Sequence, residues 1–507
     1  MGVPGDGAFL EYHEPNIIAI LTLISFFFFL AIADWVADKI VRAGLIGQIV
    51  VGLIYGVPVG NILAIEWQET FLALGYIGLI LIIFEGGLTI RLDLLRQNFV
   101  LSVVAALLGV LTPIALSFAL LYAGFGHGAI ESFIVGTALC TTSLGTIFVV
   151  INSASRGVDF SQTRVGTVLI SAAILDDVCG LVLVSVIHQL RGLADGDGSL
   201  GWIIGRPILA SGLMAVLTPI IAKFFLAPLF RKFLQPKFAR FKHVANILLM
   251  LLVLSAFLAI AAYAGASALF GAFLAGTIAS SLPSRRPGSP FAVASRQEGE
   301  ESPEKCPTFL HTFEKYISGV QRYVLQPLFF ASIGFSVPFL SMWTGEMIWK
   351  GVVFTVLTAI GKLIVGVCVP IWDVIENAKS ENVIEKPTTA VANWAPATLL
   401  GAAMVARGEI GLLIIQIGLN ETPYLSEKAF IIGIWAIVLN TIIGPVSVGI
   451  LLGKVGTKIA NDPRWGTQLK DEGLDVNNAA LSSNEILRVV GLPPQPHDTG
   501  TMRSSSA

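Results

Sequence analysis

The chain has 507 residues, of which 54% are hydrophobic and only 13% are charged. Such a composition excludes an ordinary soluble domain, and the long continuous apolar runs exclude the short alternating segments of a β-barrel. The formal net charge of −2 and the scattered basic residues argue against a nucleic-acid-binding surface. The composition therefore indicates an all-α, polytopic membrane protein.

Hydropathy predicts about thirteen membrane-spanning helices. We expect them near residues 15–33, 41–60, 69–90, 99–123, 130–152, 164–189, 202–228, 244–263, 265–282, 322–341, 347–373, 396–419 and 428–452. A short extracytoplasmic segment, residues 1–14, precedes this transmembrane domain (15–455), and a polar cytoplasmic tail, residues 456–507, follows it. Within the domain, residues 283–318 are rich in Pro, Ser and charges of both signs, and predict a disordered cytoplasmic loop.

The distribution of basic residues predicts the orientation in the membrane. An odd number of spans places the termini on opposite sides, and the loops of one side hold most of the 32 lysines and arginines. The loops of the other side hold only Arg191, Arg206, Lys350 and Lys428. By the positive-inside rule, the N-terminus is outside or lumenal and the C-terminus is cytoplasmic. The pattern does not say whether the membrane is the plasma membrane or an internal one.

Two adjacent aspartates, Asp176 and Asp177, lie in the middle of an apolar segment, residues 165–186. A carboxylate at mid-membrane depth costs roughly 3 kcal/mol on the mildest scale, and more on others. The pair therefore predicts a function that needs a titratable, cation-attracting group in a water-filled cavity, which is the transport of protons, cations or both. The alternative is a structural pair that caps or bridges helices.

Two of the expected spans are interrupted at comparable places. Residues 140–146 (CTTSLGT) and 407–411 (RGEIG) are poor helix formers, because glycines loosen the backbone and hydroxyls compete for its hydrogen bonds. If the spans divide as six, one and six, these runs occupy corresponding spans. Paired interruptions predict the two crossed, broken helices of a transporter with inverted repeats. The alternative is ordinary helix packing through small residues.

Further charged residues fall within the expected spans, among them Lys223, which lies near the cytoplasmic end of its span. Lys362 and Arg407 lie too deep to reach the membrane surface easily. Arg407 and Glu409 flank the second interruption, where opposite charges could neutralise the ends of two half-helices. We expect these two residues to organise the broken helix rather than to bind the transported ion.

Several segments follow one another in an order that is characteristic of a known family. They are residues 84–95 (FEGGLTIRLDLL), 141–148 (TTSLGTIF), 174–185 (ILDDVCGLVLVS), 313–337 (FEKYISGVQRYVLQPLFFASIGFSV), 359–366 (AIGKLIVG) and 406–414 (ARGEIGLLI). Over about residues 40–455, the chain thereby resembles the monovalent cation:proton antiporter superfamily, in the sodium/hydrogen exchanger family. The resemblance is to the branch that carries a paired Asp-Asp.

The resemblance implies thirteen helices arranged as a dimerisation domain and a mobile core domain, in a homodimer that works by an elevator-like motion. It implies that Asp177 binds the ion and the proton, and that Asp176 pairs with the basic residue Lys362. Thr142 and Ser143 match the broken-helix segment that lends oxygen ligands. Leu175 departs from the pattern, because some relatives have a hydroxyl residue there.

We therefore expect a secondary antiporter that exchanges Na⁺ or K⁺ for H⁺ by alternating access, with Asp177 as the transient ligand of the cation. Its partners would be these ions, the lipid bilayer and a second copy of the chain. We expect no cofactor and no enzymatic activity, since the sequence has no HExxH, nucleophile-elbow or phosphate-loop motif. The alternatives are a gated K⁺ channel or efflux system, which would need a large ligand-sensing domain, and a sodium-coupled solute symporter.

The role of Lys362 has two interpretations that differ in stoichiometry. If Lys362 is a fixed counter-charge for Asp176, one proton moves for each cation. If Asp176 is instead a second ion ligand and Lys362 releases a proton when the cation binds, two protons can move. The sequence does not distinguish these schemes.

Overall fold

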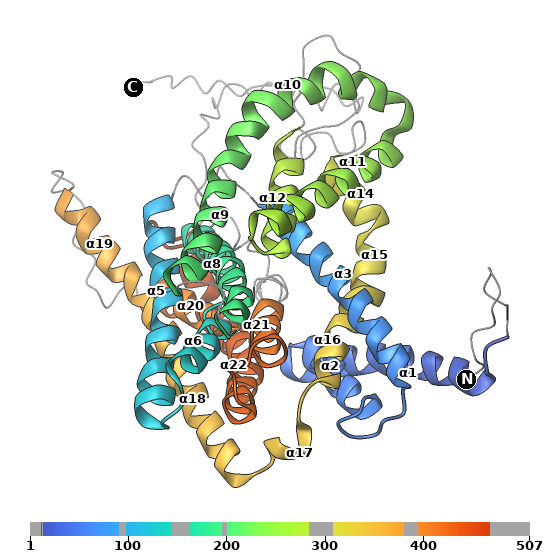
Figure 1. The fold of residues 1–507 in the computed structure, drawn as a ribbon. Helices are drawn as coiled ribbons and strands as arrows, with labels where there is room; N and C mark the ends of the chain where they lie inside the picture. The colour runs from blue at the N-terminus through green and yellow to red at the C-terminus, as the bar shows by residue number, and fades with distance from the viewer. Residues whose placement is uncertain are drawn as a thin grey trace, which may run out of the picture.

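A computed structural model of the chain describes residues 12, 14–90, 98–143, 160, 163–194, 200–282, 308–379 and 394–466. All regular elements in these ranges are helices (Figure 1). In chain order they are α1 (Ile17–Val41), α2 (Gly44–Tyr55), α3 (Ile65–Thr89), α5 (Phe99–Ser117), η1 (Phe118–Gly124), α6 (Ala129–Ala138), α8 (Arg164–Ala194), α9 (Leu200–Ile221), η3 (Ala222–Leu226), α10 (Ala227–Leu229), η4 (Phe230–Leu234), α11 (Gln235–Ala264), α12 (Ala268–Ser281), α14 (Phe309–Tyr316), α15 (Ser318–Val320), η5 (Gln321–Leu325), α16 (Gln326–Phe335), α17 (Phe339–Met342), α18 (Gly345–Leu363), η6 (Ile364–Val367), α19 (Cys368–Lys379), α20 (Trp394–Val405), α21 (Glu409–Glu421) and α22 (Glu427–Ala460).

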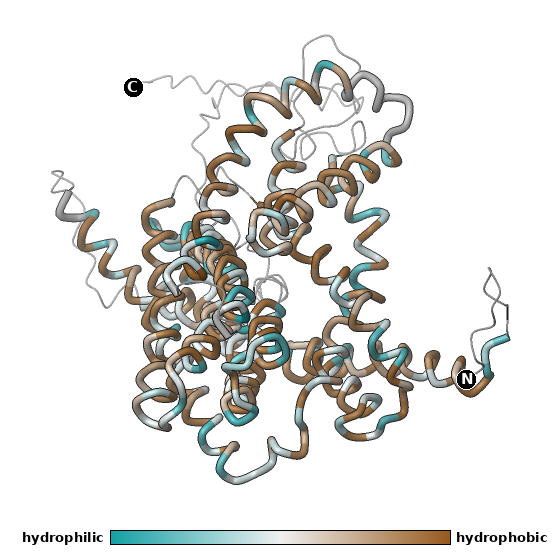
Figure 2. The backbone as a smooth tube through the Cα atoms, in the orientation of Figure 1, coloured by the Kyte–Doolittle hydropathy of each residue, from teal (hydrophilic) through white to brown (hydrophobic). Residues whose placement is uncertain are grey.

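The all-α, multi-span prediction is confirmed. Nine helical segments of the described chain are long and apolar enough to cross a membrane, and three shorter apolar helices accompany them: α2, α6 and α12. Brown, hydrophobic stretches run along most of these helices in Figure 2. The count of thirteen spans stays a prediction.

The loop predicted for residues 283–318 overlaps the described residues only at its end. There the prediction of disorder is wrong, because residues Phe309–Tyr316 form α14. The Thr308 side chain caps the helix by accepting a hydrogen bond from the His311 backbone N–H. Phe309 and Phe313, which are four residues apart on one face, are buried. Residues 283–307, most of the N-terminal segment 1–14 and the tail from residue 467 lie outside the described residues.

The helices pack as two groups. In the first, which we call the crossing group, α5, α6, α8, α18, α20, α21 and α22 pack against one another. In the second, the scaffold group, α1, α2, α3, α11, α12 and α16 pack together. In Figure 1 the crossing group lies on the left and most of the scaffold group on the right. The α9 helix packs mainly on α8 and leads toward the scaffold group.

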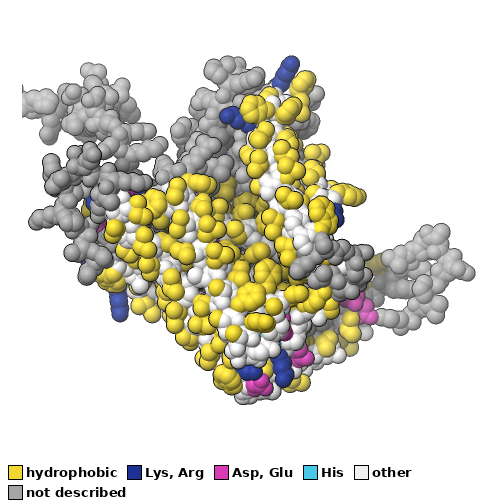
Figure 3. Space-filling model, turned by 60° about the vertical axis from the view of Figure 1, so that its left-hand side comes forward, with side chains coloured by type: hydrophobic (Ala, Val, Ile, Leu, Met, Phe, Trp, Pro, Cys, Tyr) yellow, Lys and Arg dark blue, Asp and Glu magenta, His cyan; other side chains and the backbone are white. Residues whose placement is uncertain are grey.

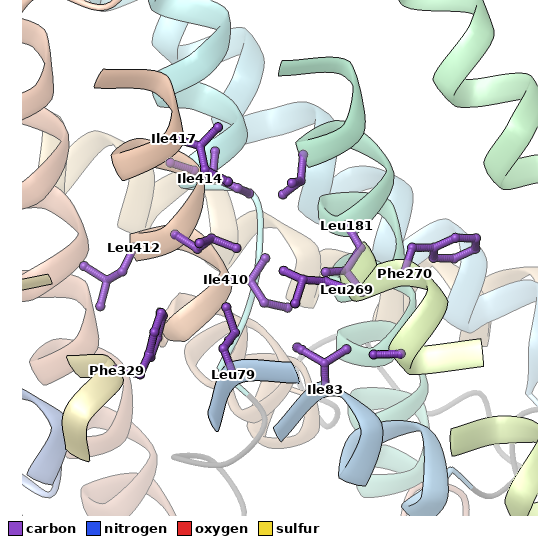
Figure 4. Packing of buried hydrophobic residues seen from close by; sticks show 14 of the residues in the cluster. Leu79, Ile83, Leu181, Leu269, Phe270, Phe329, Ile410, Leu412, Ile414 and Ile417 are labelled. Atoms are coloured by element: carbon purple, nitrogen blue, oxygen red, sulfur yellow. The ribbon is translucent and has the colours of Figure 1, made fainter. Parts of the chain in front are cut away.

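A seam of apolar side chains joins the two groups. Figure 4 shows Leu79 and Ile83 of α3 and Phe329 of α16 facing Ile410 and neighbouring residues of α21. These side chains belong to one cluster that spans both groups, and all are at least nine-tenths buried. The contacts among these apolar side chains are stabilised by dispersion and shape complementarity rather than by ion pairs or hydrogen bonds.

The outer surface suits a lipid environment. Large apolar side chains of α1 and α9 are exposed, among them Ile24 and Phe28 on α1 and Leu209 and Leu213 on α9. Figure 3 shows a broad hydrophobic face on which the charged side chains gather near the margins. An exposed apolar surface of this extent indicates contact with lipid. The protein is therefore an integral, multi-pass membrane protein.

Glycines allow α3 and α12 to approach closely. A Cβ atom added at Gly276 of α12 would overlap the backbone of α3 at Phe84 and Gly87. Because this obstacle is backbone, it cannot move aside as a flexible side chain could. Small residues at helix contacts serve this purpose in membrane proteins.

We predict that Gly276→Ala destabilises the scaffold group by about 1–3 kcal/mol, the usual effect of overpacking. Gly453→Ala is the matched control, because an added Cβ atom there meets no other atom within 4 Å. Thermal unfolding of the purified variants would show a lower Tm for Gly276→Ala only. Equal melting temperatures for both variants would contradict the close α3–α12 packing.

Candidate functional site

Two non-helical segments cross inside the crossing group. One follows α6, which ends at Ala138, and includes residues 141–143; the other, residues 406–408, separates α20 from α21. The Ser143 backbone N–H donates to the Ala406 carbonyl at 3.0 Å. The Arg407 Nη1 atom donates to the Thr141 carbonyl at 2.9 Å. The predicted interruption at 407–411 is confirmed at residues 407 and 408, whereas residues 409–411 already belong to α21. Residues 144–146 of the first run lie outside the described residues.

Glycine is required at the crossing. A Cβ atom on Gly408 would lie 2.8 Å from both the Cβ and the Oγ atoms of Ser143. Real Cβ atoms do not approach other atoms this closely, so a side chain at residue 408 would push the two segments apart. The glycine that breaks the helix in the sequence is thus the one that lets the two segments meet.

Asp176 on α8 and Lys362 on α18 form a fully buried ion pair. The Lys362 Nζ atom lies 2.6 Å from Asp176 Oδ2, and neither side chain is exposed. Lys362 also donates to the Cys140 carbonyl at 2.6 Å and to the Thr142 hydroxyl at 3.1 Å. An ammonium has three N–H donors, so all three have acceptors here. This complete pairing makes a buried charge tolerable at this depth.

Thr142 joins the broken segment to the ion pair. Its hydroxyl accepts the hydrogen bond from Lys362 and donates one to Asp176 Oδ2 at 3.0 Å. Asp176 Oδ1 has no hydrogen-bond partner among the described residues. One oxygen of Asp176 is therefore held by two donors, while the other is buried without one.

Asp177 has different surroundings, although it is the next residue of α8. Its side chain is partly exposed, and its carboxylate receives a hydrogen bond from the Thr142 backbone N–H. Within the described part of the chain, no basic side chain forms an ion pair with it. Glu409 lies close enough to repel it electrostatically. Asp177 is therefore a carboxylate beside a neutralised pair, with a second carboxylate nearby.

The charges at the second break follow the helix dipoles. Arg407 is the second residue after the C-terminal end of α20, and Glu409 is the first residue of α21. A positive charge is favourable at a C-terminal end and a negative charge at an N-terminal end. The fully buried Arg407 does not pair with Glu409 but with the Thr141 carbonyl. The Thr441 hydroxyl donates to the Arg407 carbonyl at 3.1 Å.

The structure thus brings together every site residue singled out in the sequence: Asp176, Asp177, Thr142, Ser143, Lys362, Arg407 and Glu409. Sequence reasoning missed the carbonyl of Cys140, which binds Lys362. The run of hydroxyl residues after Cys140 indicated backbone carbonyls without helical hydrogen bonds. It did not indicate that the Lys362 ammonium would bind one of them. Sequence reasoning also missed the fully buried Asn440. Its side-chain amide donates to the Thr358 hydroxyl, one helical turn before Lys362.

Non-helical backbone is tolerated at membrane depth only where it is buried in protein or lines a water-filled cavity, and buried charges there commonly mark an ion or substrate path. Crossed, interrupted helices around such charges are the arrangement of a secondary transporter. The family model described as the transmembrane part of sodium/hydrogen exchangers matches residues 23–454. The chain belongs to the sodium/hydrogen exchanger family.

Individual relatives are similar over most of their length. The chain is 25% identical to the Na⁺/H⁺-K⁺ antiporter GerN of Bacillus cereus, covering 80% of this chain and 90% of that protein. It is 24% identical to a Na⁺/H⁺ antiporter of Enterococcus hirae, covering 81% and 92%. Among solved structures, the sodium proton antiporter MjNhaP1 of Methanocaldococcus jannaschii shares the fold, with a TM-score of 0.54 and 18% identity over 86% of this chain and 98% of that one.

We predict that Lys362→Ala destabilises the protein by about 3–5 kcal/mol, because it leaves the Asp176 carboxylate buried and unpaired. Lys454→Ala, at an exposed position of α22, is the matched control. Combining Lys362→Met with Asp176→Leu should recover part of the loss, since no unpaired charge remains. A Tm for Lys362→Ala equal to that of the control would contradict the stabilising role of the pair.

Proposed function

We propose that the protein is a secondary antiporter that exchanges Na⁺ or K⁺ for H⁺ by alternating access, and that cation and proton compete for Asp177. The observation that carries this proposal is the contrast between adjacent aspartates. Asp176 is already neutralised by Lys362 at 2.6 Å, whereas Asp177 is partly exposed and has a carboxylate, Glu409, as its charged neighbour. Of the two aspartates, only Asp177 has a charge that an incoming ion would neutralise.

Electrostatics supply the competition. Two carboxylates that share a poorly solvated site repel each other, so a bound cation or a bound proton relieves the same repulsion. Either species neutralises Asp177, and the two exclude each other because they occupy the same oxygens. Exchange follows if the site switches its access from one side of the membrane to the other only when Asp177 is neutralised.

The broken segment supplies further ligands. A hard monovalent cation prefers oxygen ligands. Thr142 and Ser143 lie in the segment that touches Asp177 through the Thr142 backbone N–H. This proximity supports the proposal that hydroxyls and carbonyls of this segment complete a coordination shell that Asp177 begins. In this proposal Arg407, which donates to the Thr141 carbonyl, and Glu409, in the first turn of α21, organise the second broken segment.

The Lys362 contacts favour one proton per cation. Lys362 has acceptors for all three donors, and Asp176 Oδ2 is occupied by two of the hydrogen bonds around it. A lysine so bound is a fixed counter-charge rather than a group that gives up a proton in each cycle. We therefore favour the scheme in which Asp177 alone exchanges its proton.

The motion and the assembly belong to the same proposal. The crossing group carries the whole site, and an apolar seam joins it to the scaffold group. We propose that the crossing group moves as the core domain against the scaffold group, which dimerises with a second copy. The distribution of basic residues supports an N-terminus outside or in the lumen and a cytoplasmic C-terminus. The relatives' names leave both Na⁺ and K⁺ as candidates.

Asp177→Asn should abolish cation-dependent proton flux in proteoliposomes that carry an imposed pH gradient, because asparagine cannot exchange a proton. Na⁺, K⁺, Li⁺ and choline are added in turn, and the cation that collapses the gradient in the wild type identifies the substrate. The Tm should stay close to that of the wild type, since Asp177 has no ion pair in the described part of the chain.

Glu346→Gln is the matched control, because it replaces a different carboxylate, which pairs with Lys350 at the start of α18. It should retain exchange. Wild-type exchange by folded Asp177→Asn would overturn the assignment of Asp177, and wild-type protein that moves no protons with any alkali cation would overturn antiport.

A further inference from the structure

The segment that follows α22 caps the helix that carries the aspartate pair. The helix α8 begins at Arg164, and its first backbone N–H groups need acceptors from outside the helix. The Arg164 N–H donates to the Gly466 carbonyl at 3.0 Å, and the Val165 N–H donates to the Trp465 carbonyl at 3.3 Å. Residues far apart in the sequence thus complete the start of α8.

Local hydrogen bonds shape this cap. After α22 ends, Asp462 Oδ1 accepts hydrogen bonds from the backbone N–H groups of Arg464 and Trp465, both at 2.9 Å. The Gly466 N–H donates to the Asp462 carbonyl at 2.9 Å. An added Cβ atom at Gly466 would overlap the carbonyl oxygens of Ala460 and Asp462, so the turn requires glycine.

Trp465 connects this cap to α19. Its side chain is completely buried, and its indole Nε1–H donates to the Asp373 carboxylate, 3.1 Å from Oδ1 and 3.0 Å from Oδ2. The Arg164 guanidinium stacks on the indole ring at 5.1 Å and forms an ion pair with Glu376 of α19 at 3.2 Å. The N-terminal end of α8 and the middle of α19 are therefore joined both through Trp465 and by the Arg164–Glu376 ion pair.

The same two helical stretches are joined a second time at the ion pair. The α18 helix continues through η6 into α19, so Lys362 and Asp373 lie on one stretch, about 17 Å apart at 1.5 Å per residue. Arg164 and Asp176 are separated by roughly 18 Å along α8. The two attachments therefore match in spacing. Together they limit how far α8 can shift along its axis relative to the α18–α19 stretch.

We propose that Trp465 is a positioning residue for ion exchange: by tying the Arg164 end of α8 to α19, it sets the register of Asp176 against Lys362 and hence the position of Asp177. This inference rests on the proposed function only for its transport readout. A loosened cap lets α8 shift along its axis, which weakens the contacts of Asp176 and changes how well Asp177 competes for a cation. The turnover rate, which depends on the motion of the whole core, changes little.

The first test is cation-dependent proton flux by full-length Trp465→Phe in proteoliposomes. Phenylalanine fills most of the buried volume but lacks the N–H that Asp373 accepts. The apparent KM for the cation should change roughly two- to tenfold, the factor expected for one lost hydrogen bond, with a nearly unchanged maximal rate per inserted protein. Trp394→Phe, at an exposed tryptophan of α20, is the matched control and should keep the wild-type KM.

Asp373→Ala removes the other partner of the same hydrogen bond. Its change in KM should be at least as large as that of Trp465→Phe, and the double variant should show no larger change than Asp373→Ala alone. A KM for Trp465→Phe equal to that of the Trp394→Phe control, or factors that multiply in the double variant, would overturn the proposal.

A second measurement is independent of transport. The Tm is determined for Trp465→Phe, for Asp176→Asn and for the double variant. Sites this far apart normally contribute additively. If Trp465 sets the register of the ion pair, the Tm shift of the double variant differs from the sum of the Tm shifts of the two single variants. Additive Tm shifts would overturn the proposal. Because these melts need no ion flux, they decide the role of Trp465 even if the wild type proves not to be an antiporter.

Discussion

The buried ion pair between Asp176 and Lys362 is the interaction on which the rest of the site depends. Removing two charges from water is costly, and their attraction offsets that cost only when the remaining donors are also satisfied. Here the other acceptors are the Cys140 carbonyl and the Thr142 hydroxyl, and both are available because α6 ends before them. The broken helix and the ion pair are therefore one structure, and neither would be stable without the other.

This arrangement separates two aspartates that are neighbours in the sequence. Asp176 is fully buried and is fixed by Lys362 and Thr142, whereas Asp177 is partly exposed and close to Glu409. One carboxylate thus serves the structure, and the other is left with a charge that a proton or a cation can neutralise. The contact between the two helix groups is mainly apolar, but hydrogen bonds also cross it: the Gln416 side-chain amide donates to the Ile333 carbonyl at 3.5 Å, and the Ser267 backbone N–H donates to the Ser185 hydroxyl at 2.7 Å.

Much of this site could be predicted from the sequence, because charge at membrane depth is a strong constraint. Asp176, Lys362 and the glycine-containing break near Arg407 all stand out against apolar spans. The sequence could not reveal that Arg407 binds the Thr141 carbonyl instead of Glu409, since that depends on how two distant segments cross. For the same reason the cap at Trp465 was missed, because its partners lie on α8 and α19. The helix α14 was predicted as loop, because the surrounding composition concealed its single apolar face.

Competition between cation and proton at Asp177 is tested most directly by counting the protons released when the purified protein binds the transported cation. Calorimetric titration in buffers of different ionisation enthalpy gives this number without a membrane gradient. We predict that the wild type releases about one proton per cation at a pH well below the midpoint of its pH profile, where Asp177 is protonated before the cation binds, and about half a proton at the midpoint, because Asp177 alone exchanges. Binding without proton release, or release that persists in Asp177→Asn, would contradict the assignment of Asp177 as the shared site.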